Sequence, residues 1–280
     1  MIKLEKNNEN NSLKVELTSH ALDLFEDKLP FLCVFESYVT NEEIWCHTLN
    51  AGTWVVWNGG MVPFNLKVFD NKNNLIYHKL HDIEDMGELD QIFNFYTQMN
   101  QNTKGIVIGS HDGTFGHWIK PVKENKTKCL LVEGSKHQFM KLFQNYNRLD
   151  NCTFINEIVT DDGKDVVWFT GGEGFTDSVE KSTLEIFLNN ESIKSEHRKS
   201  ISINDLIEKF EYQKFDWLHT DVEGFDDKLI MSLKYFPKII IFENAHVKRM
   251  NNYGKLEDFL LSKNYKLIDF GFDTLAIKQD

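Results

Sequence analysis

From Lys104 onward, apolar runs that suit β-strands alternate with segments of helical periodicity, and this alternation most constrains the fold. Parallel strands need long crossovers, usually helical, so such alternation is typical of a doubly wound α/β sheet. We expect strands at residues 105–109, 129–133, 153–159, 215–221 and 238–243, and helices near 114–123, 136–149, 203–210, 225–235 and 254–263. Residues 265–270 and 273–278 then predict a closing antiparallel hairpin.

A glycine-punctuated turn follows the first of these strands. Gly109, Gly113 and Gly116 are spaced Gly-x-x-x-Gly-x-x-Gly, and Glu133 stands alone at the end of the next strand. Ligands of open α/β sheets bind beyond the carboxyl ends of the strands, where glycines admit a ligand and an acid can accept ribose hydroxyls. Dinucleotide enzymes use Gly-x-Gly-x-x-Gly, so this spacing and the closing hairpin favour S-adenosylmethionine (SAM) over NAD. A plain turn and a solvated acid are the alternatives.

The first part of the chain has a different pattern. Short runs rich in β-branched and aromatic residues, with a turn at residues 71–73, predict a small β-rich module over residues 1–85. Its Trp54 and Trp57 suit either a core or contact with a sugar ring. Apolar residues at helical spacing predict a linking helix within residues 86–103, which leaves residues 104–280 for the α/β domain.

Composition restricts the partners of the chain. Its 280 residues carry 31 Lys and Arg against 43 Asp and Glu, a net charge of −12, so a nucleic-acid substrate is not expected. The four cysteines form no Cys-x-x-Cys pair and predict no zinc site. No secretory leader and no apolar stretch near the ~20 residues of a membrane span are recognisable, so we expect a cytoplasmic protein.

Six segments of the α/β part resemble, in order, motifs of the FkbM-type family of SAM-dependent methyltransferases. The most specific is residues 219–226, which is similar to the family's Lys-x-Asp-x-Glu-Gly-x-Glu. The other five are residues 107–113, 131–133, 156–161, 202–207, and 239–243 followed by His246. The resemblance implies a Rossmann-like methyltransferase fold that binds SAM through Gly109, Ser110, His111, Asp112, Gly113, Glu133 and Ile158.

The chain departs from the family at Val107. An acid usually stands at this position, two residues before the first loop glycine, and helps to hold the amino-acid end of SAM. Asp112, inside the loop, could supply a carboxylate instead, or it could be a turn residue that bonds its own backbone.

Four residues are candidates for the chemistry: Asp221, His219, His246 and Glu223. Methyl transfer to an alcohol needs alignment of the hydroxyl and a group that accepts its proton, and a carboxylate or imidazole at the sheet edge can do both. The alternative for Asp221 and Glu223 is capping of the helix that follows them. These acids, with Glu243 and the two histidines, could also hold a divalent metal, but the spacing is not diagnostic and no metal is predicted.

The sequence therefore predicts a SAM-dependent methyltransferase that modifies a hydroxyl on a sugar, a glycan or another small metabolite. The β-rich module is expected to help to recognise this acceptor. Two alternatives stay open at this point. One is a different nucleotide-dependent α/β enzyme such as a dehydrogenase, and the other is a carbohydrate-binding protein whose methyltransferase fold has lost activity.

Overall fold

The structure is a computed structural model. It describes residues 102–279 except 125, 171–176 and 188–191, together with residues 88–100, Lys72 and the strand backbone of the first 79 residues. The chain forms two compact units, Met1–Gln101 and Asn102–Asp280. Among the described residues, no helix has both the length and the apolar character that a membrane span requires.

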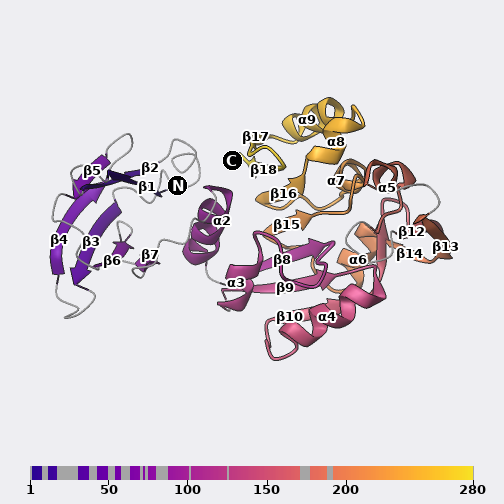
Figure 1. The fold of residues 1–280 in the computed structure, drawn as a ribbon, viewed down its shortest axis with the longest axis horizontal. Coiled ribbons are helices and arrows are strands. Elements are labelled where there is room, and N and C mark those ends of the chain that lie inside the picture. Colours follow the sequence, from indigo (N-terminus) through magenta and orange to yellow (C-terminus); the bar gives the residue numbers. More distant parts are fainter. Residues whose placement is uncertain are drawn as a thin grey trace. The chain divides into compact units, whose positions relative to one another are not determined.

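The described residues of the first unit form two antiparallel sheets and helix α2 (Glu88–Met99) (Figure 1). A three-stranded sheet has the order β1-β2-β5 and a four-stranded sheet the order β4-β3-β6-β7. The strands are β1 (Ile2–Asn7), β2 (Ser12–Leu17), β3 (Phe31–Ser37), β4 (Glu43–Leu49), β5 (Trp54–Trp57), β6 (Phe64–Phe69) and β7 (Leu75–Lys79). These strands lie within residues 1–85, for which the sequence predicted a β-rich module, whereas the side chains of Trp54 and Trp57 lie outside the described residues.

Helix α2 (Glu88–Met99) ends the first unit. Leu89, Ile92, Phe93 and Tyr96 are all buried, and they recur every three or four residues along the helix. This spacing places them on one face, as the sequence predicted for residues 86–103.

The second unit is built on one seven-stranded sheet of order β10-β9-β8-β15-β16-β18-β17 (Figure 1). The strands are β8 (Thr103–Ile108), β9 (Thr127–Val132), β10 (Cys152–Ile155), β15 (Trp217–Thr220), β16 (Ile239–Glu243), β17 (Tyr265–Asp269) and β18 (Asp273–Lys278). All neighbours are parallel except β18, which runs antiparallel to both β16 and β17. The predicted doubly wound α/β sheet with a closing antiparallel hairpin is confirmed.

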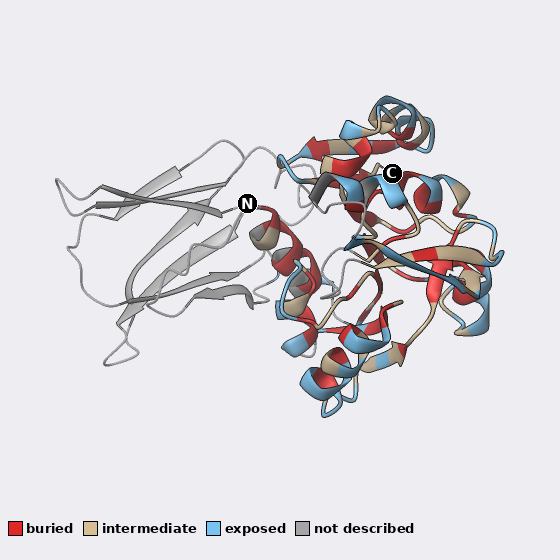
Figure 2. Ribbon diagram, turned by 45° about the vertical axis from the view of Figure 1, so that its right-hand side comes forward, coloured by how far each residue is buried: buried red, intermediate tan, exposed pale blue. Residues whose placement is uncertain are grey.

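Helices connect the parallel strands and cover the sheet, whose strands are buried in Figure 2. The main core lies against Ile106, Leu218, Ile240 and other sheet residues of the same face. Residues on both faces of the central strands are buried, which explains why their sequences are continuous apolar runs. The helices are α3 (Ile119–Lys123), α4 (Lys136–Tyr146), α6 (Ile203–Lys209), α7 (Asp226–Ser232), α8 (Ala245–Arg249) and α9 (Tyr253–Ser262).

Three segments differ from the sequence-based prediction. Helix α3 is shorter than residues 114–123, because Gly116 within that range has a φ angle of +117°, which a right-handed helix cannot contain. The strand predicted at 153–159 divides in two, since β10 pairs with β9 while β11 (Ile158–Thr160) pairs with β14 (Ser200–Ser202). The segment between β10 and α6 is an insertion that lies outside the seven-stranded sheet. It contains β11, β14, the antiparallel pair of β12 (Val166–Thr170) and β13 (Lys194–Arg198), and helix α5 (Lys181–Phe187) between the last two strands.

Candidate functional site

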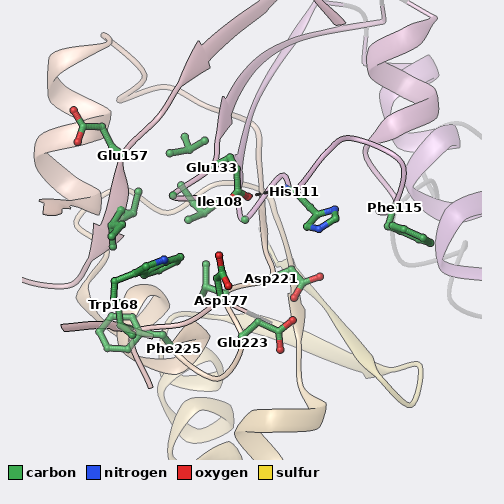
Figure 3. A pocket seen from close by; sticks show the side chains of 17 residues that line it. Ile108, His111, Phe115, Glu133, Glu157, Trp168, Asp177, Asp221, Glu223 and Phe225 are labelled. Carbon is green, nitrogen blue, oxygen red and sulfur yellow. Dashed lines mark hydrogen bonds between the residues drawn. The ribbon is translucent and has the colours of Figure 1, made fainter. Parts of the chain in front are cut away.

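A pocket of about 220 Å³ lies beyond the carboxyl ends of β8, β9 and β15, where this fold binds ligands. Its apolar wall includes Ile108, Val132, Ile158, Trp168 and Phe225. Five acids also line it, namely Glu133, Glu157, Asp177, Asp221 and Glu223, whereas none of its described lining residues is lysine or arginine. Figure 3 shows Trp168 beside Phe225, and Asp221 next to Glu223. This composition suits a ligand that has an apolar ring and a positive charge.

Gly109 begins the loop after β8 and lines the pocket. Its backbone N–H and that of Ser110 both donate to the carbonyl oxygen of Val132, at 3.0 Å each. The φ angle of Gly109 is +80°, and a Cβ atom there would lie 1.9 Å from the backbone oxygen of Asp221. Glycine is therefore required because the ends of β8 and β15 approach each other closely.

Three predicted cofactor residues support the loop rather than line the pocket. Ser110 is buried, and its hydroxyl donates to the Val132 carbonyl at 2.9 Å. A Cβ at Gly113 would lie 2.3 Å from the ring of Tyr146, whose hydroxyl donates to the Gly113 carbonyl at 2.7 Å. The Oδ1 atom of Asp112 accepts the Thr114 N–H at 3.0 Å, which is the turn alternative stated for this residue.

The Asp112 carboxylate, one of the two alternatives for the acid missing at Val107, is thus engaged in a turn. Burial raises the pKa of Asp112, but its hydrogen bonds with Thr114 and His111 outweigh this effect and the pKa is lowered overall. Val107 itself is fully buried in the sheet. Neither residue lines the pocket, so a positively charged group would have to be met by the acids that do.

Glu133 follows β9 and is only 7% exposed. Its Oε2 accepts the backbone N–H of His111 at 2.8 Å (Figure 3), and its Oε1 accepts that of Ser135 at 2.7 Å. His111 has a left-handed φ of +50°, which is uncommon outside glycine. A carboxylate offers about four lone-pair positions, so Glu133 is fixed by two bonds and can still accept hydroxyl hydrogens from a ligand.

Burial raises the pKa of Glu133 from 4.5 to about 7, although its two backbone hydrogen bonds act in the opposite direction. Between these pH values the folded chain keeps a proton that the unfolded chain releases, so the free energy of unfolding falls as pH rises. We expect the Glu133 contribution to fall by up to about 3 kcal/mol from pH 4.5 to pH 7. Glu133→Gln cannot titrate, so urea unfolding of this variant should lack that part of the decrease. Parallel pH curves for the two proteins would contradict this shift.

Asp221 and Glu223 lie after β15 and form the second acidic part of the site. Burial among protein atoms and the charges of Glu243 and Asp273 raise the pKa of Asp221 to about 7. The residue is nevertheless exposed to the cleft, so water screens this shift until a ligand fills the pocket. Burial and neighbouring acids also raise the pKa of Glu223 to about 9, and its φ angle is +53°.

His246 lies at the start of α8, close to these acids. Its Nδ1 is 2.8 Å from Oε2 of Glu243 and 3.5 Å from Oε2 of Glu223. The structure therefore brings together Glu223, His246 and Glu243 at the ends of β15 and β16.

His219 is placed differently from the other catalytic candidates. It is 4% exposed, and its ring centroid is 5.9 Å from that of His117, which in turn contacts Asp273 at 3.3 Å. It is not among the residues that line the pocket. Strand β15 ends at Thr220, so Asp221 lies just beyond the strand that contains His219.

Several pocket residues had no counterpart in the sequence-based prediction. Phe225 lies within the motif residues 219–226, so the motif itself could have indicated it. Trp168 and Asp177 enter through the β12–β13 insertion. No periodicity in the chain predicts where that insertion folds.

No protein-family model and no curated protein match this chain. Among solved structures, an Aeropyrum pernix fibrillarin in complex with SAM is similar at 11% identity, 63% of this chain, 66% of that chain and a TM-score of 0.36. A Methanococcus jannaschii fibrillarin matches at 12% identity and a TM-score of 0.37, with 99% of this chain and 98% of that chain covered. An Aquifex aeolicus SAM-dependent methyltransferase matches at 9% identity, 68% and 87% coverage and a TM-score of 0.37. These values are too low to identify a function.

Proposed function

We propose that the chain is a SAM-dependent methyltransferase of the FkbM type. The observation that carries the proposal is the acidic, partly apolar pocket beyond β8, β9 and β15, which has no lysine or arginine among its described lining residues. SAM has a positive sulfonium and a positive ammonium group, whereas the pyrophosphate of NAD is negative and would meet five carboxyl groups. The charge of the pocket therefore favours SAM over a dinucleotide.

The pocket residues have the chemical groups that the ribose and the adenine of SAM require. The carboxylate of Glu133 is oriented by two backbone N–H groups and retains acceptor positions for ribose hydroxyls. Trp168, Ile158 and Phe225 offer an apolar surface suited to an adenine ring. When bound, SAM supplies a methyl group on a positively charged sulfur, which is a strong electrophile.

The task of the chain is then to align the acceptor and take its proton. Asp221 lies in the pocket wall beside Gly109, and its raised pKa of about 7 suits proton acceptance near neutrality. We assign Asp221 as the group that would orient the acceptor hydroxyl and take its proton when the methyl group passes from the sulfur to that oxygen, with the sulfur leaving as a neutral thioether. Glu223 completes the same acidic edge.

The acceptor is proposed to be an uncharged or cationic small molecule that carries a hydroxyl, such as a sugar or glycan. The acids at the pocket edge would repel a phosphorylated acceptor, and the net charge of −12 disfavours nucleic acid.

The contribution of Glu133 gives a direct test of the site. Glu133→Ala should weaken SAM binding by about 1.5–3 kcal/mol, the size of a charge-assisted hydrogen bond. Isothermal titration calorimetry measures this change, with Glu124→Ala on the exposed end of α3 as the control. Unchanged affinity in Glu133→Ala would remove this residue from the site.

The first unit is proposed to help to recognise the acceptor. Residues 102–280 should fold without it, because they form a compact unit with a core of their own. We expect the isolated piece to unfold cooperatively in urea and to bind SAM, but to methylate the acceptor more slowly than the full chain. Full activity would make the first unit a separate interaction module, and an insoluble piece would show that the two units share a core.

A further inference from the structure

The cluster of Glu223, Glu243 and His246 stands at the acidic edge of the pocket. Its three ligand-type atoms all lie within 4.8 Å of one another. Glu223 follows β15 and lines the pocket, Glu243 ends β16, and His246 belongs to α8, the helix that follows. Two segments thus converge on one point, one after β15 and one that runs from the end of β16 into α8.

The two distances from His246 to the carboxylates are close to those between ligands of one metal ion. Bonds of about 2.0–2.2 Å from carboxylate oxygen and imidazole nitrogen to a divalent cation place neighbouring ligand atoms about 3–3.5 Å apart. The Nδ1 atom of His246 is 2.8 Å from Glu243 and 3.5 Å from Glu223, and its side chain is 6% exposed. An ion could replace the proton between these groups without a large rearrangement.

The surrounding charges favour a cation. Asp221 and the fully buried Asp226 add carboxyl groups near Glu223, and Asp273 faces the same region as Asp221. His246 can carry at most one positive charge against this group. Buried charges of one sign are costly unless they are protonated or paired, and a divalent ion would pair two carboxylates at once.

Hydrogen bonds donated by Asn244 hold in place the segment that carries two of the ligands, Glu243 and His246. Asn244, between Glu243 and His246, is fully buried. Its amide donates to Asp269 at 3.1 Å and to the hydroxyl of Thr274 at 2.7 Å. Such outer contacts orient the ligands of metal sites.

We propose that Glu223, Glu243 and His246 bind one divalent cation of the Mn²⁺ class. Two carboxylates with one imidazole suit Mn²⁺ or Fe²⁺ better than Ca²⁺ or Mg²⁺, which prefer oxygen ligands alone. Because Glu223 lines the pocket, the ion would keep positions open toward the cleft, where a hydroxyl or carbonyl oxygen of the acceptor could bind. Binding of the cation does not depend on the proposed function, whereas its role toward an acceptor rests on the proposed methyl transfer.

Electron paramagnetic resonance with Mn²⁺ alone tests the site, because the signal of free aqueous Mn²⁺ falls when the ion binds. The full chain, freed of metal with a chelator and dialysed, should bind one Mn²⁺. Glu243→Gln and Glu223→Gln should each weaken this binding at least tenfold, whereas the same change at the exposed Glu124 should not. Mg²⁺ in equal excess should displace little of the bound Mn²⁺.

An unchanged Mn²⁺ signal, or native affinity in Glu223→Gln, would overturn the cation site. Circular dichroism establishes whether each variant is folded, and if Glu243→Gln is not, the partly exposed Glu223 provides the decisive variant. A SAM titration of the same samples separates the two proposals. SAM binding without Mn²⁺ binding refutes only the cation, whereas Mn²⁺ binding without SAM binding refutes only the proposed function.

Discussion

Asp221→Asn should lower the single-turnover rate of methyl transfer by about 10²–10⁴-fold, the usual contribution of a general base. The substitution keeps the size of the side chain but removes the charge that orients the acceptor hydroxyl and accepts its proton. Asp221 lines the pocket, and the charges of Glu243 and Asp273 contribute to its raised pKa. SAM affinity should stay nearly constant, because Glu133 and the apolar wall are unchanged.

The measurement uses saturating SAM and an acceptor that the native chain methylates. Asp162→Asn is the matched control, since this aspartate lies on an exposed turn outside the pocket. A near-normal rate in Asp221→Asn would return Asp221 to a structural role before α7 and leave His246 as the leading candidate. Lost SAM affinity with a normal rate at saturation would instead place Asp221 at the ammonium group of SAM.

Gly109→Ala should lower the free energy of unfolding by about 2–6 kcal/mol. A left-handed conformation costs an alanine about 1–3 kcal/mol, and forced displacement of packed atoms costs about as much again. The new Cβ would lie 1.9 Å from the backbone oxygen of Asp221, so β8 and β15 would have to separate. Such a shift would also move Asp221 and reduce SAM binding.

Two glycines of the same unit separate these effects in urea unfolding. Gly271 has a φ of +94°, and no atom lies within 4 Å of the position that a Cβ would take there, so Gly271→Ala reports the backbone strain alone. Gly254, in helix α9, has neither strain nor a close neighbour, and its replacement by alanine should stabilise the chain by about 0.5–1 kcal/mol. If Gly109→Ala lowers the free energy of unfolding no more than Gly271→Ala does, the close approach of β8 and β15 does not require a glycine at position 109.

The sheet was predictable because its strands carry a strong local signal. Residues 239–243 and 129–132 are apolar runs bounded by polar segments, and the structure places them in β16 and β9. Strand β13 offers no such signal, since Lys194–Arg198 consists of polar residues that are largely exposed. Its position depends on pairing with β12, a contact between segments that the local pattern does not specify.

Residues of the pocket lining were predictable where they stand directly after a strand. Glu133 and Asp221 come directly after β9 and β15, and both line the pocket. Ser110, Asp112 and Gly113 share the loop with Gly109, but their contacts are made with Val132, Thr114 and Tyr146, respectively. Spacing along the chain does not reveal which loop residues face a ligand and which support the turn.

Calorimetric titration of the full chain with SAM and, separately, with NAD tests the central claim most directly. We predict one SAM bound per chain and no detectable heat from NAD, because five acids line the pocket without a described lysine or arginine among its lining residues. Binding of NAD in place of SAM, or of neither ligand, would contradict the proposed methyltransferase site.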